Sequence, residues 1–126
     1  MYSFLLVGAG GAIGAMARHG FGSIVGRLWS MSFPLASLLV NVLGSLAMGV
    51  FIGLMARFLP AWQNEARLFV AVGVLGGFTT FSSFSLDTIV LIERGNLLMA
   101  GAYVLLSVVL CLIGLYLGLL VTRGVA

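Results

Sequence analysis

Residues 76–85 read Gly-Gly-Phe-Thr-Thr-Phe-Ser-Ser-Phe-Ser, a polar and helix-breaking stretch inside a long apolar run. Apolar residues flank it on both sides, at 68–75 and 89–92. Inside a bilayer every backbone N–H and C=O group needs a partner, so a broken helix persists only where it lines a cavity or binds something. Two adjacent glycines and five hydroxyl side chains at that depth predict a site that handles an ion.

The backbone of this stretch suggests one kind of ion chemistry. Gly76 and Gly77 are expected to end a half-helix, because glycine adopts the left-handed conformation found just past helix C-termini. The last carbonyl groups would then point into the break with the negative end of the helix dipole, and such unwound carbonyls bind Na⁺ or K⁺. Thr79 and Thr80 are candidate N-caps of a second half-helix over about 80–92. The structural alternative is a glycine kink whose polar groups are satisfied by threonine hydroxyls.

The side chains of the stretch suggest a second ion chemistry. Phe81 and Phe84 are three residues apart and share a helix face, while Ser82 and Ser85 share a neighbouring face. Aromatic rings carry a negative face and a positive edge, so ring edges along a narrow passage could contact a small, partly dehydrated anion. Packing of both rings against lipid or another helix is the structural alternative.

Two other polar sites lie in apolar surroundings. Asn41 stands within Leu-Leu-Val-Asn-Val-Leu-Gly, and a buried amide there must find a partner and can offer two N–H donors. Tyr103, Ser107 and Cys111 recur every four residues and form a hydroxyl and thiol stripe on one helix face. Interhelical hydrogen bonding explains either site alone. Their occurrence beside a broken helix favours a shared polar pathway.

The elements that position these residues follow from composition. The chain has 126 residues, of which 62% are hydrophobic and only 7% charged, so it is expected to be an all-α integral membrane protein in contact with lipid. Four apolar runs approach the roughly 20 residues that cross a bilayer. They cover 3–25, 34–55, 68–91 (broken near 76–80) and 97–121. The short connections leave no room for another domain, so 1–126 is read as a single transmembrane domain.

Charge and cysteine usage narrow the function further. All six basic residues are arginines, scattered singly: Arg18, Arg27, Arg57, Arg67, Arg94 and Arg123. No basic run indicates nucleic-acid binding. With four crossings, three arginines lie on the side of the termini, two on the other and one within the first span. This near balance indicates that the chain inserts in both directions. The single cysteine and the lack of metal or catalytic motifs argue against an enzyme.

Small residues spaced four apart predict close helix packing. The pairs are Gly10 and Gly14, Gly22 and Gly26, Gly49 and Gly53, and Gly114 and Gly118. The glycine-rich run at 8–14 has Ile13 where a dinucleotide-binding fingerprint needs its third glycine, and no strand precedes it. A nucleotide site is therefore rejected.

Taken together, the stretch 76–85, Val40-Asn41, Arg18 and the four-span layout resemble the Fluc (CrcB) family of fluoride channels over essentially the whole chain. The resemblance implies a multi-pass protein of the cell (inner or plasma) membrane that exports fluoride passively. It implies that Phe81 and Phe84 present ring edges to fluoride, that Asn41 coordinates it, and that Arg18 draws anions toward the vestibule. The implied polar track continues through Ser83, Tyr103 and Ser107.

The resemblance also implies an assembly. The family forms an antiparallel, dual-topology homodimer with two pores, which agrees with the near-balanced arginines. Gly76 and Thr79 match the positions whose backbone carbonyls, two from each subunit, hold a structural Na⁺ at the dimer interface. Four carbonyl oxygens suit a small hard cation.

The chain departs from the family pattern in three places. It has Ala36-Ser37-Leu38 where Gly-Thr-Leu is frequent, Asp87 where Glu is usual, and Cys111 where a small hydroxyl residue could extend the polar track.

Two rival functions remain open. A small four-helix multidrug or cation exporter needs a carboxylate in its first span, and residues 3–25 contain no Asp or Glu. A non-transporting assembly subunit would need only the small-residue packing motifs. It leaves Asn41 and the hydroxyl cluster unexplained, because buried polar groups cost stability unless they are satisfied.

Overall fold

The computed structural model describes residues 2–29 and 33–123, and these are almost entirely helical. The long helices are α1 (Tyr2–Leu28), α2 (Leu35–Phe58) and α6 (Leu97–Arg123). Between α2 and α6 runs a composite helix built from α3 (Gln63–Ala66), the π-helical segment η1 (Arg67–Leu75), α4 (Gly76–Phe78) and α5 (Phe81–Glu93). The predicted all-α class is confirmed for these residues.

Three of the helical stretches are long and apolar enough to cross a membrane: Leu35–Phe58, Gln63–Glu93 and Leu97–Arg123. The protein is thus an all-α, multi-pass membrane protein. The predicted first span corresponds to α1, whose 27 residues are long enough at about 1.5 Å per residue but which is not among the three. That helix carries seven glycines as well as Arg18 and His19. The fourth crossing therefore stays a prediction.

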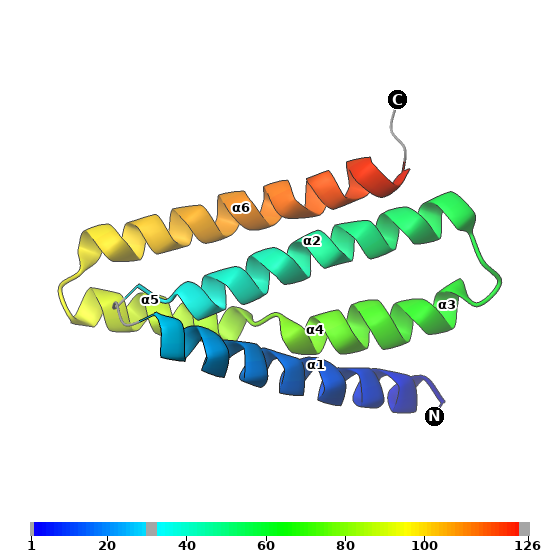
Figure 1. Cartoon of the computed structure of the whole chain (residues 1–126), viewed down its shortest axis with the longest axis horizontal. Coiled ribbons are helices and arrows are strands. Elements are labelled where there is room, and N and C mark those ends of the chain that lie inside the picture. Colours follow the sequence, from blue (N-terminus) through cyan, green and yellow to red (C-terminus); the bar gives the residue numbers. More distant parts are fainter. Residues whose placement is uncertain (1, 30–32, 124–126) are drawn as a thin grey trace.

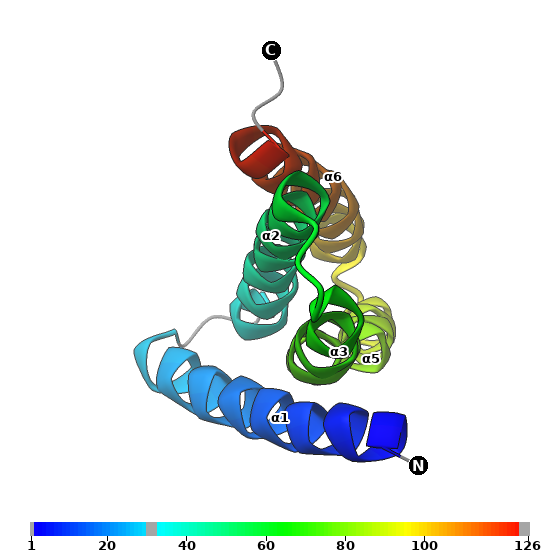
Figure 2. The same cartoon turned by 90° about the vertical axis from the view of Figure 1, so that its right-hand side faces the viewer.

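The helices form a layered bundle in which consecutive long elements run in opposite directions (Figure 1). In this view α6 lies next to α2, the composite helix follows, and α1 lies on the outside. The start of α1, the end of α6 and the α2–α3 connection lie at the same end of the bundle. Seen end-on, α1 crosses beneath the other helices rather than running parallel to them (Figure 2).

Small residues set the closest helix contacts, as the glycine pairs predict. Gly10 and Gly14 are buried where α1 packs on η1 and α4, and a Cβ on Gly14 would collide with the backbone of Val74. The pairs on α2 and α6 are likewise buried where these two helices pack side by side: Gly49, Gly53, Gly114 and Gly118. Gly22 and Gly26 differ, because a Cβ on either would meet nothing within 4 Å in this chain.

The helix break lies where the sequence predicts it, but it is built differently. Gly76 has helical angles (φ −62°, ψ −38°), and α4 continues to Phe78. The chain is extended at Thr79 (φ −83°, ψ 157°) and Thr80 (φ −149°, ψ 122°). The expected left-handed glycines are therefore wrong. Gly77 serves close packing instead, because a Cβ on it would lie 2.6 Å from the Gly11 carbonyl oxygen.

Candidate ion site at the break in the third span

The side-chain amide of Asn41 holds the backbone at the break through two hydrogen bonds. Asn41 Nδ2 donates to the Thr80 carbonyl oxygen at 3.0 Å, and the Thr80 N–H donates to Asn41 Oδ1 at 2.8 Å. We call this pair the Asn41–Thr80 clasp. It fixes the amide orientation, because a flip would place like groups opposite each other at both contacts. One N–H of Nδ2 is left over for another acceptor.

Threonine hydroxyls satisfy other groups at the break. Thr80 Oγ1 accepts a hydrogen bond from the Ser83 N–H at 3.1 Å and so caps α5. The N-cap prediction is thus confirmed for Thr80. Thr79 does not cap α5; its hydroxyl donates back to the Leu75 carbonyl oxygen at 2.9 Å. The threonine-patched kink, the structural alternative from the sequence, is therefore present, although it does not account for every carbonyl of the break.

Two carbonyl groups lose their helical donors at the break. In an unbroken helix the N–H groups of Thr80 and Ser83 would reach the carbonyl oxygens of Gly76 and Thr79. Here those N–H groups donate to the side chains of Asn41 and Thr80. Within the described part of the chain no three His, Cys, Asp or Glu side chains gather where they could hold a metal. Carbonyl oxygens without donors are ligands that small hard cations accept, so Gly76, which is exposed, and Thr79 stay the candidate positions for the predicted cation site.

Arg18 reaches the break from α1. Its Nε donates to the Gly77 carbonyl oxygen at 3.1 Å and so binds the C-terminal end of α4, where the helix dipole is negative. A guanidinium has five N–H donors, so further donors are available for an anion. The family resemblance implies only an electrostatic role for Arg18. Its contact with Gly77, which lies 59 residues away, has no sequence signal.

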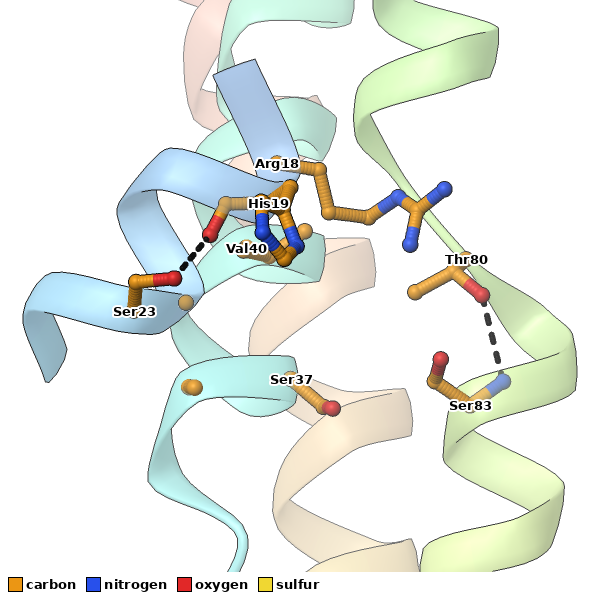
Figure 3. A pocket seen from close by; sticks show the side chains of 9 residues that line it. Arg18, His19, Ser23, Ser37, Val40, Thr80 and Ser83 are labelled. Atoms are coloured by element: carbon orange, nitrogen blue, oxygen red, sulfur yellow. Dashed lines mark hydrogen bonds between the residues drawn. The ribbon is translucent and has the colours of Figure 1, made fainter. Parts of the chain in front are cut away.

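A polar cavity of about 300 Å³ opens beside the break (Figure 3). Arg18 and His19 enter it from α1, Ser37 from α2, and Thr80 and Ser83 from the break and α5. In Figure 3 the side chain of Arg18 extends from α1 toward Thr80. The remaining lining residues are Gly22, Ser23, Ala36 and Val40. The cavity has no carboxylate in its lining and carries a fixed positive charge, which favours anions.

A second, more apolar cavity of about 420 Å³ is bordered by the clasp. Asn41 and Thr80 line it, and Thr80 therefore borders both cavities. Its other lining residues are Gly44, Ser45, Met48, Thr79, Phe81, Phe84, Ser107, Val108, Cys111, Leu112 and Leu115. Among the described residues, the buried hydroxyl of Ser107 has no hydrogen-bond partner.

Aromatic rings connect this cavity to the core of the bundle. The Phe81 and Phe84 ring centroids are 5.4 Å apart, which confirms that the two share a helix face. Phe84 packs against Tyr103 at 5.2 Å, and Tyr103 packs edge-on against Phe33 at 5.6 Å. Phe84 is thus held from behind, whereas Phe81 is 77% exposed on the surface of the single chain.

The structure separates the predicted pathway residues into groups. Arg18 and Ser83 line the polar cavity, whereas the apolar cavity takes Asn41, Phe81, Phe84 and Ser107. Tyr103 lines neither. It is fully buried and donates a hydrogen bond to Asp87 Oδ2 at 3.2 Å. The predicted stripe on α6 therefore faces the cavity at Ser107 and Cys111, while Tyr103 supports Phe84 from behind.

Comparison with known proteins supplies a family. A family model described as "CrcB-like protein, Camphor Resistance (CrcB)" matches residues 5–119. Three relatives carry the name "Fluoride-specific ion channel FluC". The relative from Roseobacter denitrificans is 50% identical over 132 residues, 99% of this chain and 98% of its own length. The relative from Hyphomonas neptunium is 46% identical over 125 residues, which cover 99% of this chain and 98% of the relative. The relative from Rhodospirillum centenum is 50% identical over 125 residues, which cover 98% of this chain and 97% of the relative.

Both comparisons extend over nearly the whole chain, including the break and both cavities. The relatives are named as ion channels and not as enzymes. This chain therefore belongs to the CrcB family of membrane proteins.

Proposed function

We propose that this chain is a fluoride-selective channel through which fluoride leaves the cytoplasm passively. The names of its relatives point to fluoride. The observation that carries the proposal is the Asn41–Thr80 clasp, which holds an amide with one N–H left over in the wall of the apolar cavity, while Thr80 borders both cavities. Hydrogen fluoride crosses membranes as a neutral acid and dissociates in a more neutral cytoplasm, so a passive exit lowers the cytoplasmic fluoride concentration.

The proposed path joins the two cavities. Fluoride is attracted into the polar cavity by Arg18 and meets the hydroxyl of Ser83 there. It then passes the clasp, where the free N–H of Asn41 donates a hydrogen bond to it. Beyond the clasp it moves along the edges of Phe81 and Phe84 toward the Ser107 hydroxyl, and Tyr103 keeps Phe84 in place. This path uses seven predicted site residues, six as lining and one as support.

Selectivity follows from the kind of donors along this path. A small anion gives up its hydration shell only where protein donors replace the lost water. Amide N–H, hydroxyl and ring-edge contacts bind it without the deep trap that a fixed charge at the narrowest point would create. Arg18 lies to one side of that point, with its Nε already bound to the Gly77 carbonyl oxygen.

The proposed active form is an antiparallel, dual-topology homodimer with two pores. Phe81 and Gly76 are exposed in the single chain, so a second copy can approach both. The carbonyl oxygens of Gly76 and Thr79 from each subunit would together give four ligands for a structural Na⁺. The loss of their helical donors supports this site. The bound ion supplies positive charge that offsets the converging carbonyl dipoles of the two subunits.

A proton-coupled cation exporter is the rival transport function. This mechanism requires a carboxylate in the first span, and α1 of this chain contains no Asp or Glu. A non-transporting subunit is the other rival function. It does not explain the polar cavity or the Ser107 hydroxyl, which has no partner among the described residues.

Liposome efflux tests the proposal. Purified protein is reconstituted into vesicles loaded with equal fluoride and chloride, and each anion is followed with its own electrode after valinomycin clamps the potential with K⁺. We expect rapid fluoride release and chloride release no faster than from protein-free vesicles. Fluoride release that matches protein-free vesicles would contradict the proposed function, and proton-driven uptake of a cationic dye would favour the exporter.

A further inference from the structure

Cys111 lies in the wall of the apolar cavity. It is the single cysteine of the chain, it stands one helical turn after Ser107 on α6, and it is only partly buried. Cysteines that react with external reagents are the partly exposed ones, whereas fully buried thiols are inert. The thiol is thus placed where a small molecule entering the cavity would meet it.

A buried polar side chain in the wall of the same cavity provides a second observation. Ser107 is 5% exposed, and its hydroxyl has no partner among the described residues although it borders the same cavity. An unpaired buried hydroxyl costs about 1–3 kcal/mol unless water or another ligand satisfies it. The cavity at Ser107 and Cys111 is therefore expected to be occupied rather than sealed and dry.

We propose that Cys111 is a covalent modification site for small neutral thiosulfonates and disulfides, at which their addition blocks conduction and a reducing thiol restores it. The inference rests on the proposed function, because ion flux through the cavity is the quantity that the modification changes. The site itself is a property of the cavity and can be detected without any flux measurement.

The chemistry balances with the reagent as the only co-reactant. The Cys111 thiol loses its proton to water, and the thiolate attacks the divalent sulfur of an alkyl methanethiosulfonate. A new S–S bond forms, the bond to the sulfonyl sulfur breaks, and methanesulfinate leaves with the electron pair. A dithiol such as dithiothreitol later attacks the mixed disulfide and becomes a cyclic disulfide, which releases both the alkyl thiol and the Cys111 thiol.

The size and character of the cavity select the reagent. Its volume of about 420 Å³ is in the range of small-molecule pockets, and its other walls near Cys111 are apolar, including Met48, Leu112 and Leu115. A neutral benzyl group on the Cys111 sulfur has room to fold into this space and to pack against these side chains. A methyl group fills much less of it. The block is therefore expected to increase with the size of the attached group.

The experiment treats reconstituted full-length protein with methyl or benzyl methanethiosulfonate and measures fluoride efflux and intact mass. Cys111→Ser removes the thiol. A matched control combines Cys111→Ser with Ile113→Cys, which moves the thiol about 3 Å along α6 to a residue that is 47% exposed and outside the cavity lining. Each variant is compared with its own untreated flux, so differences in basal rate do not matter.

For the unsubstituted chain we expect the benzyl reagent to lower flux about tenfold or more, since a close-packed cavity leaves no room for an ion. The methyl reagent should lower flux less, and dithiothreitol should restore it. Cys111→Ser should be insensitive, and the matched control should gain the benzyl mass and keep its flux.

Two results would overturn the inference: full benzyl labelling of Cys111 with unchanged flux, or no labelling of Cys111 under conditions that label the Ile113→Cys control. If the untreated chain passes no fluoride, the proposed function fails instead. Labelling of Cys111, read from intact mass, then still decides whether the modification site exists.

Discussion

Replacing Asn41 by Asp is the most informative single change at the clasp, because the two side chains have nearly the same shape. One carboxylate oxygen can still accept the Thr80 N–H that now donates to Oδ1 at 2.8 Å. The other oxygen replaces Nδ2 and faces the Thr80 carbonyl oxygen across the present 3.0 Å contact. The Asn41→Asp variant thus loses the hydrogen bond to the Thr80 carbonyl oxygen and the N–H proposed for fluoride.

The magnitude follows from the charge that the variant introduces. Two like charges about 4 Å apart repel by about 4 kcal/mol at an effective dielectric constant of about 20. Because about 1.4 kcal/mol is a tenfold change, fluoride occupancy beside the clasp should fall by roughly a thousandfold. The Thr80 carbonyl left without its donor adds about 1–3 kcal/mol of instability, which the fold must absorb.

The assay is fluoride efflux from liposomes at matched protein density. Asn64→Asp is the control, because it makes the same change on α3 at an exposed residue outside both cavities. We expect Asn64→Asp to conduct like the unsubstituted chain, and Asn41→Asp to fall at least about a hundredfold, given that repulsion. Size-exclusion chromatography checks that both variants stay folded. If folded Asn41→Asp conducted within threefold of the unsubstituted chain, Asn41 would not contact the permeating anion.

Three other perturbations test neighbouring parts of the account. Phe81→Ile and Phe84→Ile should each slow fluoride efflux and leave the dimer intact, because isoleucine has no positive ring edge. Phe58→Ile, at the exposed end of α2, is the control and should not slow efflux. Equal fluxes in all three variants would show that the ring edges do not contact fluoride. Gly14→Ala should lower the free energy of unfolding by about 1–3 kcal/mol, because its methyl group would collide with η1. Gly22→Ala should leave it unchanged, because a methyl group there meets nothing within 4 Å. Equal melting temperatures of the two variants would contradict this packing. Exchange of Na⁺ for N-methylglucamine should reduce the dimeric fraction counted by single-molecule photobleaching, and an unchanged fraction would remove the structural Na⁺.

Local patterns in the sequence are sufficient for the helices and the place of the break. The predicted spans 34–55 and 97–121 become α2 (Leu35–Phe58) and α6 (Leu97–Arg123), because long apolar runs with polar ends specify helix and extent together. The hydroxyl cluster predicts the break within a few residues, and Thr80 is the N-cap. The prediction of left-handed glycines is wrong, because the close contact of Gly77 with α1 decides the backbone there and its local conformational preference does not.

The contacts that build the site could not be predicted in this way. Asn41 and Thr80 are 39 residues apart, and Arg18 and Gly77 are 59 apart. A polar residue in an apolar run shows that a partner must exist, but only the packing of α1, α2 and the composite helix shows which partner it is. No pattern in the sequence predicts that residues 67–75 form the π-helical segment η1. We have no physical account of it.

Planar-bilayer recording under bi-ionic conditions distinguishes a fluoride-selective channel from a non-selective pore. Purified protein is inserted into a bilayer with fluoride on one side and an equal concentration of chloride on the other, with one shared impermeant cation. For a fluoride-selective channel we expect discrete current steps and a reversal potential displaced strongly in the direction set by fluoride alone. A reversal potential near zero, or a current carried by chloride, would contradict a fluoride-selective channel built around the Asn41–Thr80 clasp.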